Sequence, residues 1–299
     1  FGISEDNIRE ILTNCSKKLL DVRSKRIHPG LDDKILTSWN SLMITAFAKG
    51  YRVTGNIKYL DAAINCISFI EKNLLYEDKL LRTYKNNTAK ITGFLEDYSY
   101  FANALLDVFE IEPESKYLDL SLKLGHYLVD HFWDSSTKSF FMTSDNHEQL
   151  IIRPKSNYDL SLPSGNSVAC FLMLRLYHLT QKEKFLEIAT QIMESHAQIA
   201  AENPFGFGYL LNTIYTYLQK PTEITVINTE NSEICKHLFT KFMPESILVT
   251  ISNKTQLEKL AQFPFFTGKN FDNETSVYVC KNFSCSLPLK SVDQIDLHV

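Results

Sequence analysis

Three similar short strings recur along the first two thirds of the chain and restrict it to a repeated fold. They are Lys58-Tyr59-Leu60-Asp61, Lys116-Tyr117-Leu118-Asp119 and Lys184-Phe185-Leu186-Glu187, at spacings of 58 and 68 residues. About twenty residues upstream of the leucine in each string, a polar residue opens an apolar run: Asn40, Asp97 and Asn166. Self-similarity of this kind is typical of repeated supersecondary units. We therefore expect three units, each a helical hairpin.

The first helix of each expected hairpin carries apolar residues at a 3.6-residue period. One stripe comprises Leu36, Trp39, Leu42, Met43, Ala46 and Phe47, and the next comprises Phe94, Tyr98, Phe101, Ala102, Leu105, Leu106 and Phe109. The third helix, 168–179, is apolar on nearly all sides, which is typical of a helix buried all round. The second helices, expected near 57–75, 115–132 and 182–200, carry more charge. The pattern predicts a layer of inner helices and a layer of outer helices.

Two longer connections between the units have strand character. Residues 80–91 alternate around Asn86-Asn87, and residues 139–152 contain Asp145-Asn146 between apolar runs. Both predict β-hairpins. Helical hairpins joined by such loops predict a mainly α fold, an α/α toroid that is partial because the chain supplies about three hairpins. A fourth helical pattern, 205–218, is a candidate inner or closing helix.

Composition shifts divide the chain into three expected parts. Residues 1–34 hold an N-terminal helix from Ser4, a favourable cap, to Arg23, and a segment leading into the repeats. Residues 35–220 form the toroid hairpins. Residues 221–299 contain β-branched runs at 223–228, 247–252 and 276–280, with helical stretches near 231–242 and 254–262. This last part predicts a small α/β appendage.

Charge and composition exclude several classes of protein. The 299 residues are 44% hydrophobic with a net charge of −4, so bulk charge indicates neither a nucleic-acid partner nor an anionic membrane. No apolar run reaches the roughly 18 residues of a membrane span. The chain begins with Phe1, which suggests a missing upstream segment. Without a secretory signal, we expect a reducing, cytoplasmic compartment.

The six cysteines and the histidines indicate no metal or cofactor. Cys280 and Cys285 form a C-x4-C pair, which matches neither a redox helix nor half of a zinc site. His126 and His131 are five residues apart, which does not place two ligands on one helical face. No phosphate-binding or nucleotide-binding glycine motif is present. We therefore predict no metal and no cofactor.

Polar residues gather at the expected starts of the inner helices, which in a toroid converge on a central mouth. Helix N-termini attract anionic or hydroxylated ligands through free N–H groups. Adjacent acids stand at two of these starts, Asp32-Asp33 and Glu96-Asp97. Capping a helix requires only one such residue, so a pair at each start exceeds what capping needs. Paired carboxylates can serve as general acid and base. We take these four residues as candidate catalytic groups.

The remaining candidates would bind substrate around the acids. They are Trp39, Asn40, Arg82, Tyr98, Arg153, Ser164 and Asn166. Trp39 and Tyr98 would offer stacking faces, and the two arginines, in the inter-unit loops, would lean over the mouth and pair with the acids. Each has a simpler interpretation: the acids stabilise helix dipoles, Ser164 and Asn166 cap a helix, and the arginines are solvated surface groups.

Four motifs resemble a known family. They are Arg26-x-x-Pro29-x-x-Asp32-Asp33-Lys34-x-Leu36-Thr37-x-Trp39-Asn40, Gly93-Phe94-Leu95-Glu96-Asp97-Tyr98, Pro163-Ser164-Gly165-Asn166-Ser167 and Tyr278-Val279-Cys280-x-Asn282-x-x-Cys285-x-x-Pro288. The chain resembles the C-terminal half of spermatogenesis-associated protein 20-like, thioredoxin-domain-containing proteins. The resemblance implies a six-hairpin glycosidase-like toroid, and as partners an upstream toroid half and a thioredoxin-like domain. It maps Asp32, Asp33, Trp39, Asn40, Glu96, Asp97, Tyr98, Ser164 and Asn166 onto the family's inner-mouth motifs, and it implies no particular reaction.

Three functions remain open at this point. The first is a carbohydrate-active protein, glycosidase-like or sugar-epimerase-like. In hydrolysis one of Asp33 and Glu96 would act as acid and the other as base or nucleophile, and His28 is the histidine placed for epimerisation. The second is a non-catalytic toroid scaffold, whose half-ring would expose Met43, Phe47, Phe101 and Leu105 to a partner. The third is a redox role for Cys280 and Cys285, which lack the helix-start context that activates a thiol.

Overall fold

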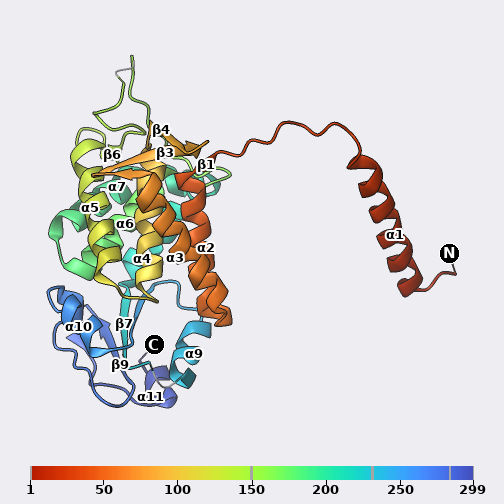
Figure 1. Ribbon diagram of the computed structural model, residues 1–299. Coiled ribbons are helices and arrows are strands. Elements are labelled where there is room, and N and C mark those ends of the chain that lie inside the picture. Colours follow the sequence, from red (N-terminus) through yellow and green to blue (C-terminus); the bar gives the residue numbers. More distant parts are fainter. Residues whose placement is uncertain (1, 149–150, 230–231, 283, 299) are drawn as a thin grey trace. The chain divides into compact units, whose positions relative to one another are not determined.

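The structure is a computed structural model that describes residues 2–148, 151–229, 232–282 and 284–298 (Figure 1). Packing divides the chain into two units, Phe1–Lys34 and Ile35–Val299. The first unit contains helix α1 (Glu5–Arg23), whose N-cap Ser4 accepts a hydrogen bond from the Asn7 N–H at 3.3 Å. The predicted N-terminal helix and its cap are confirmed.

The second unit is built around three antiparallel helical hairpins. Their helices are α2 (Thr37–Thr54) with α3 (Ile57–Asn73), α4 (Leu95–Phe109) with α5 (Ser115–His131), and α6 (Gly165–Thr180) with α7 (Glu183–Glu202). Helix α4 packs against both α2 and α6, and α6 packs against α8 (Gly208–Gln219) (Figure 1). The predicted mainly α fold, an incomplete α/α toroid of three hairpins, is confirmed.

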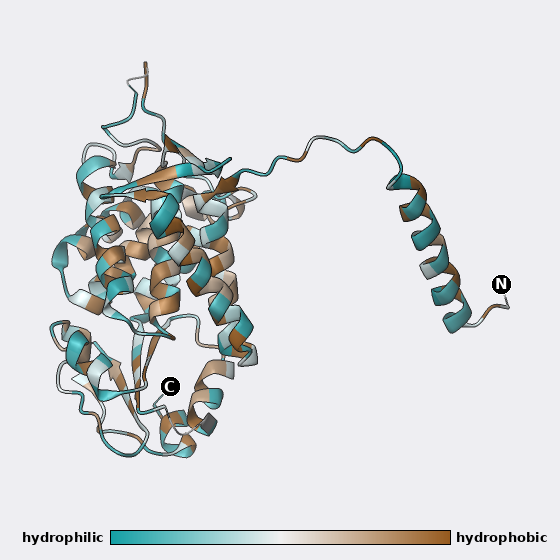
Figure 2. Ribbon diagram, in the orientation of Figure 1, coloured by the Kyte–Doolittle hydropathy of each residue, from teal (hydrophilic) through white to brown (hydrophobic). Residues whose placement is uncertain are grey.

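The inner helices form the core of this layer. Helices α4 and α6 are buried along almost their whole surfaces, as the all-round apolar pattern of α6 predicts, and the most hydrophobic ribbon gathers in this layer in Figure 2. Helices α3, α5 and α7 bury one side and expose the other, which suits their higher charge. The division into inner and outer helices therefore follows the sequence pattern.

The buried side of helix α2 is not the side that carries its predicted apolar stripe. It packs through Thr37, Ser38, Ser41, Ile44 and Ala48, mostly small residues that permit close helix approach. Trp39 and Met43 are instead 60% and 48% exposed. The exposure expected at Phe101 and Leu105 is wrong, because both lie fully buried in α4, whereas Phe47 is partly covered and stacks on Tyr59. Of the first helices of the three hairpins, α2 is thus the one with exposed large apolar side chains.

The first connecting hairpin is confirmed and the second is not. Strands β3 (Lys79–Lys85) and β4 (Thr88–Thr92) pair around Asn86 and Asn87, which have positive φ angles of 51° and 57°, and the short strands β1 (Ile35–Leu36) and β2 (Leu75–Tyr76) flank β3. Strand β6 (Ser139–Phe140) pairs antiparallel with β5 (Trp133–Asp134), which precedes it in the chain, and not with the segment that follows it. Residues 149–150 lie outside the described residues, and Ile151 and Ile152 belong to no strand.

The C-terminal part is a small α/β layer, as predicted. Its sheet has the order β10-β9-β7-β8, and β7 pairs in parallel with β8 and antiparallel with β9. The strands are β7 (Thr222–Ile227), β8 (Ser246–Ile251), β9 (Ser276–Lys281) and β10 (Ser284–Cys285). The helices are α9 (Ser232–Thr240), α10 (Lys254–Leu260) and α11 (Val292–Asp296); residue 231, where the predicted helix starts, lies outside the described residues.

Cys280 and Cys285 form a disulfide that joins β9 to β10. The two residues stand directly opposite each other in this antiparallel pair. The sequence analysis did not predict this bond, because a C-x4-C spacing by itself does not indicate that two strands reverse between the cysteines.

A buried charge network ties the inner helices together toward their C-terminal ends. The Arg175 guanidinium contacts the carboxylates of Asp107 at 3.0 Å and Glu110 at 2.7 Å. Arg52 contacts Glu110 at 2.9 Å, and Thr45 donates to Asp107 at 2.6 Å. Although burial disfavours the charged guanidinium, Asp107 and Glu110 outweigh this and raise the pKa of Arg175. The network fixes α2, α4 and α6 relative to one another.

Candidate functional site

Asp97 is a buried acid that joins the starts of α2 and α4. Its Oδ1 accepts the Ser38 N–H at 3.0 Å, and its Oδ2 accepts the Phe94 N–H at 2.9 Å and the Arg82 guanidinium at 3.2 Å. The side chain has no exposed surface. Burial raises the pKa of Asp97 to about 6, against the opposing effects of the Phe94 N–H and Arg82. Because its oxygens are engaged and enclosed, Asp97 positions the site and does not face a ligand.

Glu96 is the acid that reaches solvent. Its carboxylate lies 2.7 Å from the Arg82 guanidinium, and its side chain remains 34% exposed. Arg82, on β3, also lies over the Phe94 ring, 4.6 Å from its centroid. Burial disfavours the charged guanidinium, but Asp97 and Glu96 raise the pKa of Arg82 overall. Arg82 therefore pairs with the acids as predicted, and it holds the Glu96 carboxylate in one place.

A hollow of about 300 Å³ opens beside Glu96. The side chains of Phe94, Met142, Tyr158, Leu162 and Pro163 give it apolar faces. Glu96, Ser156, Ser161 and Ser164 give it polar groups, and among the described residues lining it Glu96 is the acidic one. Mixed apolar walls with a few convergent polar groups are typical of small-molecule sites.

One wall of this hollow is a loop, residues 154–164, that two buried polar side chains fasten. Asn166 accepts the Phe140 N–H at 2.6 Å and donates to the carbonyls of Phe140 and Ser156 at 2.9 and 3.0 Å. Asp159 accepts the N–H groups of Ser164 and Tyr209, at 2.7 and 2.8 Å. These bonds hold the wall in one conformation, and they give Asn166 a positioning role instead of the predicted contact with substrate.

Ser164 caps the N-terminus of α6, as the simpler interpretation expects, and it also lines the hollow. As N-cap of α6, its side chain accepts the Ser167 N–H at 3.0 Å. It is 5% exposed. The capping interpretation of Ser164 is confirmed, and its position places the N-terminus of α6 next to the hollow.

The two predicted stacking residues lie in very different surroundings. Tyr98 has no exposed surface; its hydroxyl accepts the Leu80 N–H at 2.9 Å, and its ring stacks on Tyr127. Tyr98 is therefore a core residue, which corrects its predicted stacking role. Trp39 is exposed at the start of α2, next to Ser38, which donates to Asp97. Asn40 donates to the Leu36 carbonyl at 2.8 Å.

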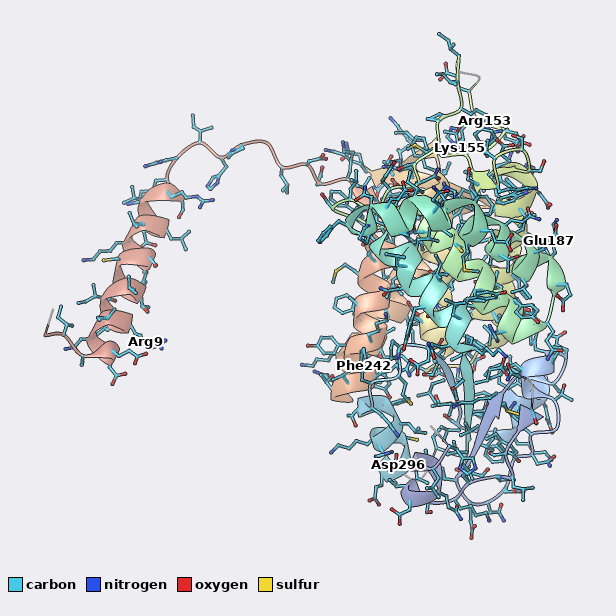
Figure 3. All side chains as sticks on the ribbon, turned by 180° about the vertical axis from the view of Figure 1, so that it is seen from behind. Arg9, Arg153, Lys155, Glu187, Phe242 and Asp296 are labelled. Carbon is cyan, nitrogen blue, oxygen red and sulfur yellow. A yellow bond between two sulfur atoms is a disulfide. The ribbon has the colours of Figure 1, made fainter. Side chains whose placement is uncertain are left out.

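Arg153 does not pair with the acids in the way predicted. Its guanidinium donates to the carbonyls of His131, at 3.1 Å, and Thr143, and it lies over the Phe141 ring at 4.1 Å. Lys155, which lies near Arg153 in Figure 3, covers the same ring and pairs with Asp134. Arg153 thus supports the loop end of the helical layer through carbonyl and ring contacts.

Asp32 and Asp33 belong to the first unit, whereas Glu96 and Asp97 belong to the second. Asp32 contacts the Lys34 ammonium at 3.2 Å within its own unit. His28 lies in the same unit, with its Nε2 at 3.2 Å from the Ser24 carbonyl oxygen. A catalytic role for Asp32 and Asp33 stays a prediction.

Three site residues escaped the sequence analysis. Ser38 contributes a backbone N–H, which carries no side-chain signal. Tyr158 lies in an aperiodic loop. His147 packs against the Phe94 ring with centroids 5.3 Å apart, and its Nε2 lies 3.1 Å from the Gly93 carbonyl oxygen. His147 is therefore a histidine of the second unit that lies against Phe94, at the start of α4.

Within the described ranges, no group of three or more His, Cys, Asp or Glu side chains could hold a metal ion. Over the same ranges, no helix combines the length and apolar character that a bilayer crossing demands.

Several solved structures align with part of this chain at low similarity. A cellobiose 2-epimerase from Bacillus thermoamylovorans aligns with 56% of this chain and 46% of its own, at 14% identity and a TM-score of 0.47. A sugar epimerase from a ruminal bacterium aligns with 58% of this chain and 47% of its own, at 18% identity and a TM-score of 0.48. An α-1,6-mannanase of Salegentibacter aligns with 60% of this chain and 52% of its own, at 16% identity and a TM-score of 0.46.

No family model matches the chain. Sequence relatives nevertheless extend over almost all of it. Human spermatogenesis-associated protein 20 is 25% identical over 97% of this chain, and an uncharacterised Caenorhabditis elegans protein is 26% identical over 98%. The chain spans only about two fifths of their lengths, 39% and 41%. Over nearly its whole length, the chain is thus similar in sequence to the proteins named spermatogenesis-associated protein 20.

Proposed function

We propose that the hollow beside Glu96 binds a carbohydrate and that Glu96 is its acid–base group. The observation that supports this most is a partly exposed carboxylate, fixed by Arg82 at 2.7 Å, on the rim of a hollow with both apolar faces and hydroxyl groups. A sugar ring has the matching character, since hydroxyl groups surround its edge and C–H groups cover its faces.

The chemistry of the hollow assigns roles to its groups. Sugar hydroxyls would donate to the Glu96 carboxylate, and hydrogen bonds to a charged acceptor are stronger than neutral ones. The apolar side chains of Met142 and Tyr158 would cover a ring face. Because Arg82 already positions Glu96, binding would cost little side-chain ordering.

Two reaction classes follow from this arrangement. Isomerisation or epimerisation moves a proton at carbon, for which Glu96 could act as base. Glycoside hydrolysis needs two carboxyl groups, about 5–5.5 Å apart in retaining enzymes and about 6.5–9.5 Å apart in inverting ones. Asp97 is enclosed, so the second unit offers Glu96 as the acidic group among the described residues that line this hollow. The second unit by itself favours proton transfer.

Sugar binding predicts a ligand-dependent gain in stability that depends on Glu96. A panel of monosaccharides and disaccharides should include one class that raises the melting temperature, since a ligand at a hundred times its Kd stabilises the native state by about 2.7 kcal/mol. In Glu96→Gln the shift should largely disappear, because an amide loses the charged acceptor and the Arg82 pairing. Differential scanning fluorimetry measures it.

The matched control is Glu187→Gln, on the outer surface of α7, away from Arg153 and Lys155 in Figure 3. This variant should keep the full shift. Equal shifts in Glu96→Gln and in the control would place the sugar elsewhere, and no shift with any sugar would remove the proposal.

The exposed side of α2 supports a second candidate function, a scaffold that packs against another helical element. Trp39, Met43, Ala46 and Val53 lie on this side at helical spacing, and each is exposed. The relatives are more than twice as long as this chain, so we propose that a helical hairpin from an upstream toroid half covers α2. A thioredoxin-like domain stays a partner expected from the resemblance.

An uncovered apolar side of α2 should make the isolated chain self-associate. We expect sedimentation velocity at tens of micromolar to show oligomers, and Met43→Glu to shift the distribution toward monomer because a buried unpaired charge is costly. Leu218→Glu, at an exposed position on α8, should leave the oligomers unchanged. A strictly monomeric wild-type chain would contradict the scaffold function.

A further inference from the structure

We propose that the site takes a chain of at least two sugar units, with Tyr158 lying between two adjacent subsites. This inference rests on the proposed carbohydrate function and extends it from one ring to a chain. It follows from a second hollow that shares Tyr158 with the first.

The second hollow has a volume of about 430 Å³ and lies against the C-terminal end of α7. Its lining includes Asn157, Tyr158, Ser195, His196, Gln198 and Phe207. Tyr158 is the residue that also lines the hollow beside Glu96. The two hollows therefore adjoin at a single side chain, and each has a volume toward the small end of the range for ligand pockets.

Tyr158 has the exposure expected of an aromatic platform. The residue is 45% exposed, which leaves part of the ring open to a ligand. The rest packs on the buried Phe207 ring, with centroids 5.0 Å apart. Gly206 permits this approach, because a Cβ there would lie 3.0 Å from Cδ1 of Tyr158. The ring is thus supported from behind and open in front.

The backbone around Tyr158 is fastened on both sides. The Asp159 N–H donates to the Gly206 carbonyl at 2.8 Å, and the Asp159 carboxylate accepts N–H groups from the starts of α6 and α8. On the other side, Asn166 donates to the Ser156 carbonyl at 3.0 Å. A platform that is already in position costs little conformational entropy on binding.

The second hollow also offers an acceptor that the protein leaves without a partner. Among the described residues, the Asn157 Oδ1 is buried and accepts no hydrogen bond. A buried acceptor of this kind is destabilising unless a donor reaches it. Ser195 and His196, whose Oγ and Nδ1 are 2.8 Å apart, line the same hollow. Asn157 itself is only half-buried, so a rotation of its amide would bring this acceptor to the hydroxyl donors of a second sugar unit, which a single ring beside Glu96 would not supply.

The test is calorimetric titration of the whole chain with two series of probes. These are glucose, cellobiose and cellotriose, and mannose, α-1,6-mannobiose and α-1,6-mannotriose. In the series that binds, affinity should rise about tenfold or more from one unit to two, since each tenfold step corresponds to about 1.4 kcal/mol. Asn157→Ala, which alters only the second hollow, should remove most of this gain and leave the monosaccharide Kd within about twofold.

Tyr158→Ala should also reduce the gain, whereas Tyr215→Ala, an exposed tyrosine on α8, should preserve it. Thermal unfolding would first establish that each variant is folded. Monosaccharide binding without any gain for longer chains would overturn the second subsite and leave the proposed function standing. A gain that persists in both Asn157→Ala and Tyr158→Ala would also overturn it. Failure of every probe to bind would remove both proposals.

Discussion

Replacing Arg175 with leucine is expected to lower the free energy of unfolding by about 3–5 kcal/mol, the range for breaking a buried ion pair on one side only. Arg175 is almost fully buried between Asp107 and Glu110, and it also donates to the Asn103 carbonyl at 3.1 Å. Its loss leaves two carboxylates buried without their shared cation. Urea unfolding of the two proteins measures the difference.

The control for this variant is an exposed ion pair. Lys184 and Glu187 lie 3.1 Å apart on the surface of α7, so Lys184→Met should cost less than about 1 kcal/mol. Adding Asp107→Asn to Arg175→Leu should recover part of the lost stability, because it removes the carboxylate that had paired with Arg175, whereas Glu110 still pairs with Arg52. A cost below about 1 kcal/mol for Arg175→Leu would show that the network does not hold the inner helices together.

The second large effect is a dependence of stability on pH that comes from Asp97. Its pKa is raised by burial from 3.8 to about 6, so the folded protein holds this proton at pH values where the unfolded chain has released it. This contribution is present below about pH 4 and is lost as pH rises through about 6. Its full size is about 3 kcal/mol, at 1.36 kcal/mol per pKa unit.

Comparison with Asp97→Asn isolates the effect from the other acids. The variant loses hydrogen bonds and should be less stable at every pH, but it has no proton to exchange. The free energy of unfolding of the wild type minus that of the variant should therefore increase by up to about 3 kcal/mol between pH 7 and pH 4. A difference that stays constant over this range would mean that Asp97 is not an enclosed acid.

Most of the helical architecture could be predicted because periodicity reports burial directly. The stripe from Phe94 to Phe109 became the buried α4, and the all-round apolar pattern after Val168 became α6. The stripe through Trp39 and Met43 did not show which side of α2 is buried. The buried side contains the small residues Ser41 and Ala48, and α2 packs against both α3 and α4, so its burial depends on its neighbours and not on one sequence pattern.

The sequence predicted the position of the candidate site more accurately than the role of each residue in it. Adjacent acids at a helix start signalled the position, but two successive side chains on a helix point in directions about 100° apart. One of the pair, Asp97, therefore turned inward to accept backbone N–H groups, and Glu96 stayed at the surface. Arg82 could be predicted because its hairpin alternates clearly.

The loop that builds the wall of the site could not be predicted. Residues 154–164 have no period, and their conformation depends on Asp159 and Asn166, whose partners lie on other elements. A single buried polar residue gives no signal in a sequence until the groups that it bonds are known. The hairpin expected over 139–152 failed for a similar reason, because β6 found its partner in β5 on its N-terminal side.

The most direct test of the central claim is a calorimetric titration of the best-binding sugar against the wild type, Glu96→Gln and Glu187→Gln. The account predicts equal affinities for the wild type and Glu187→Gln, and an affinity at least about tenfold lower for Glu96→Gln, the cost of one charge-assisted hydrogen bond. An unchanged affinity in Glu96→Gln, or no heat of binding from any sugar with the folded wild type, would contradict a carbohydrate site at the starts of the inner helices.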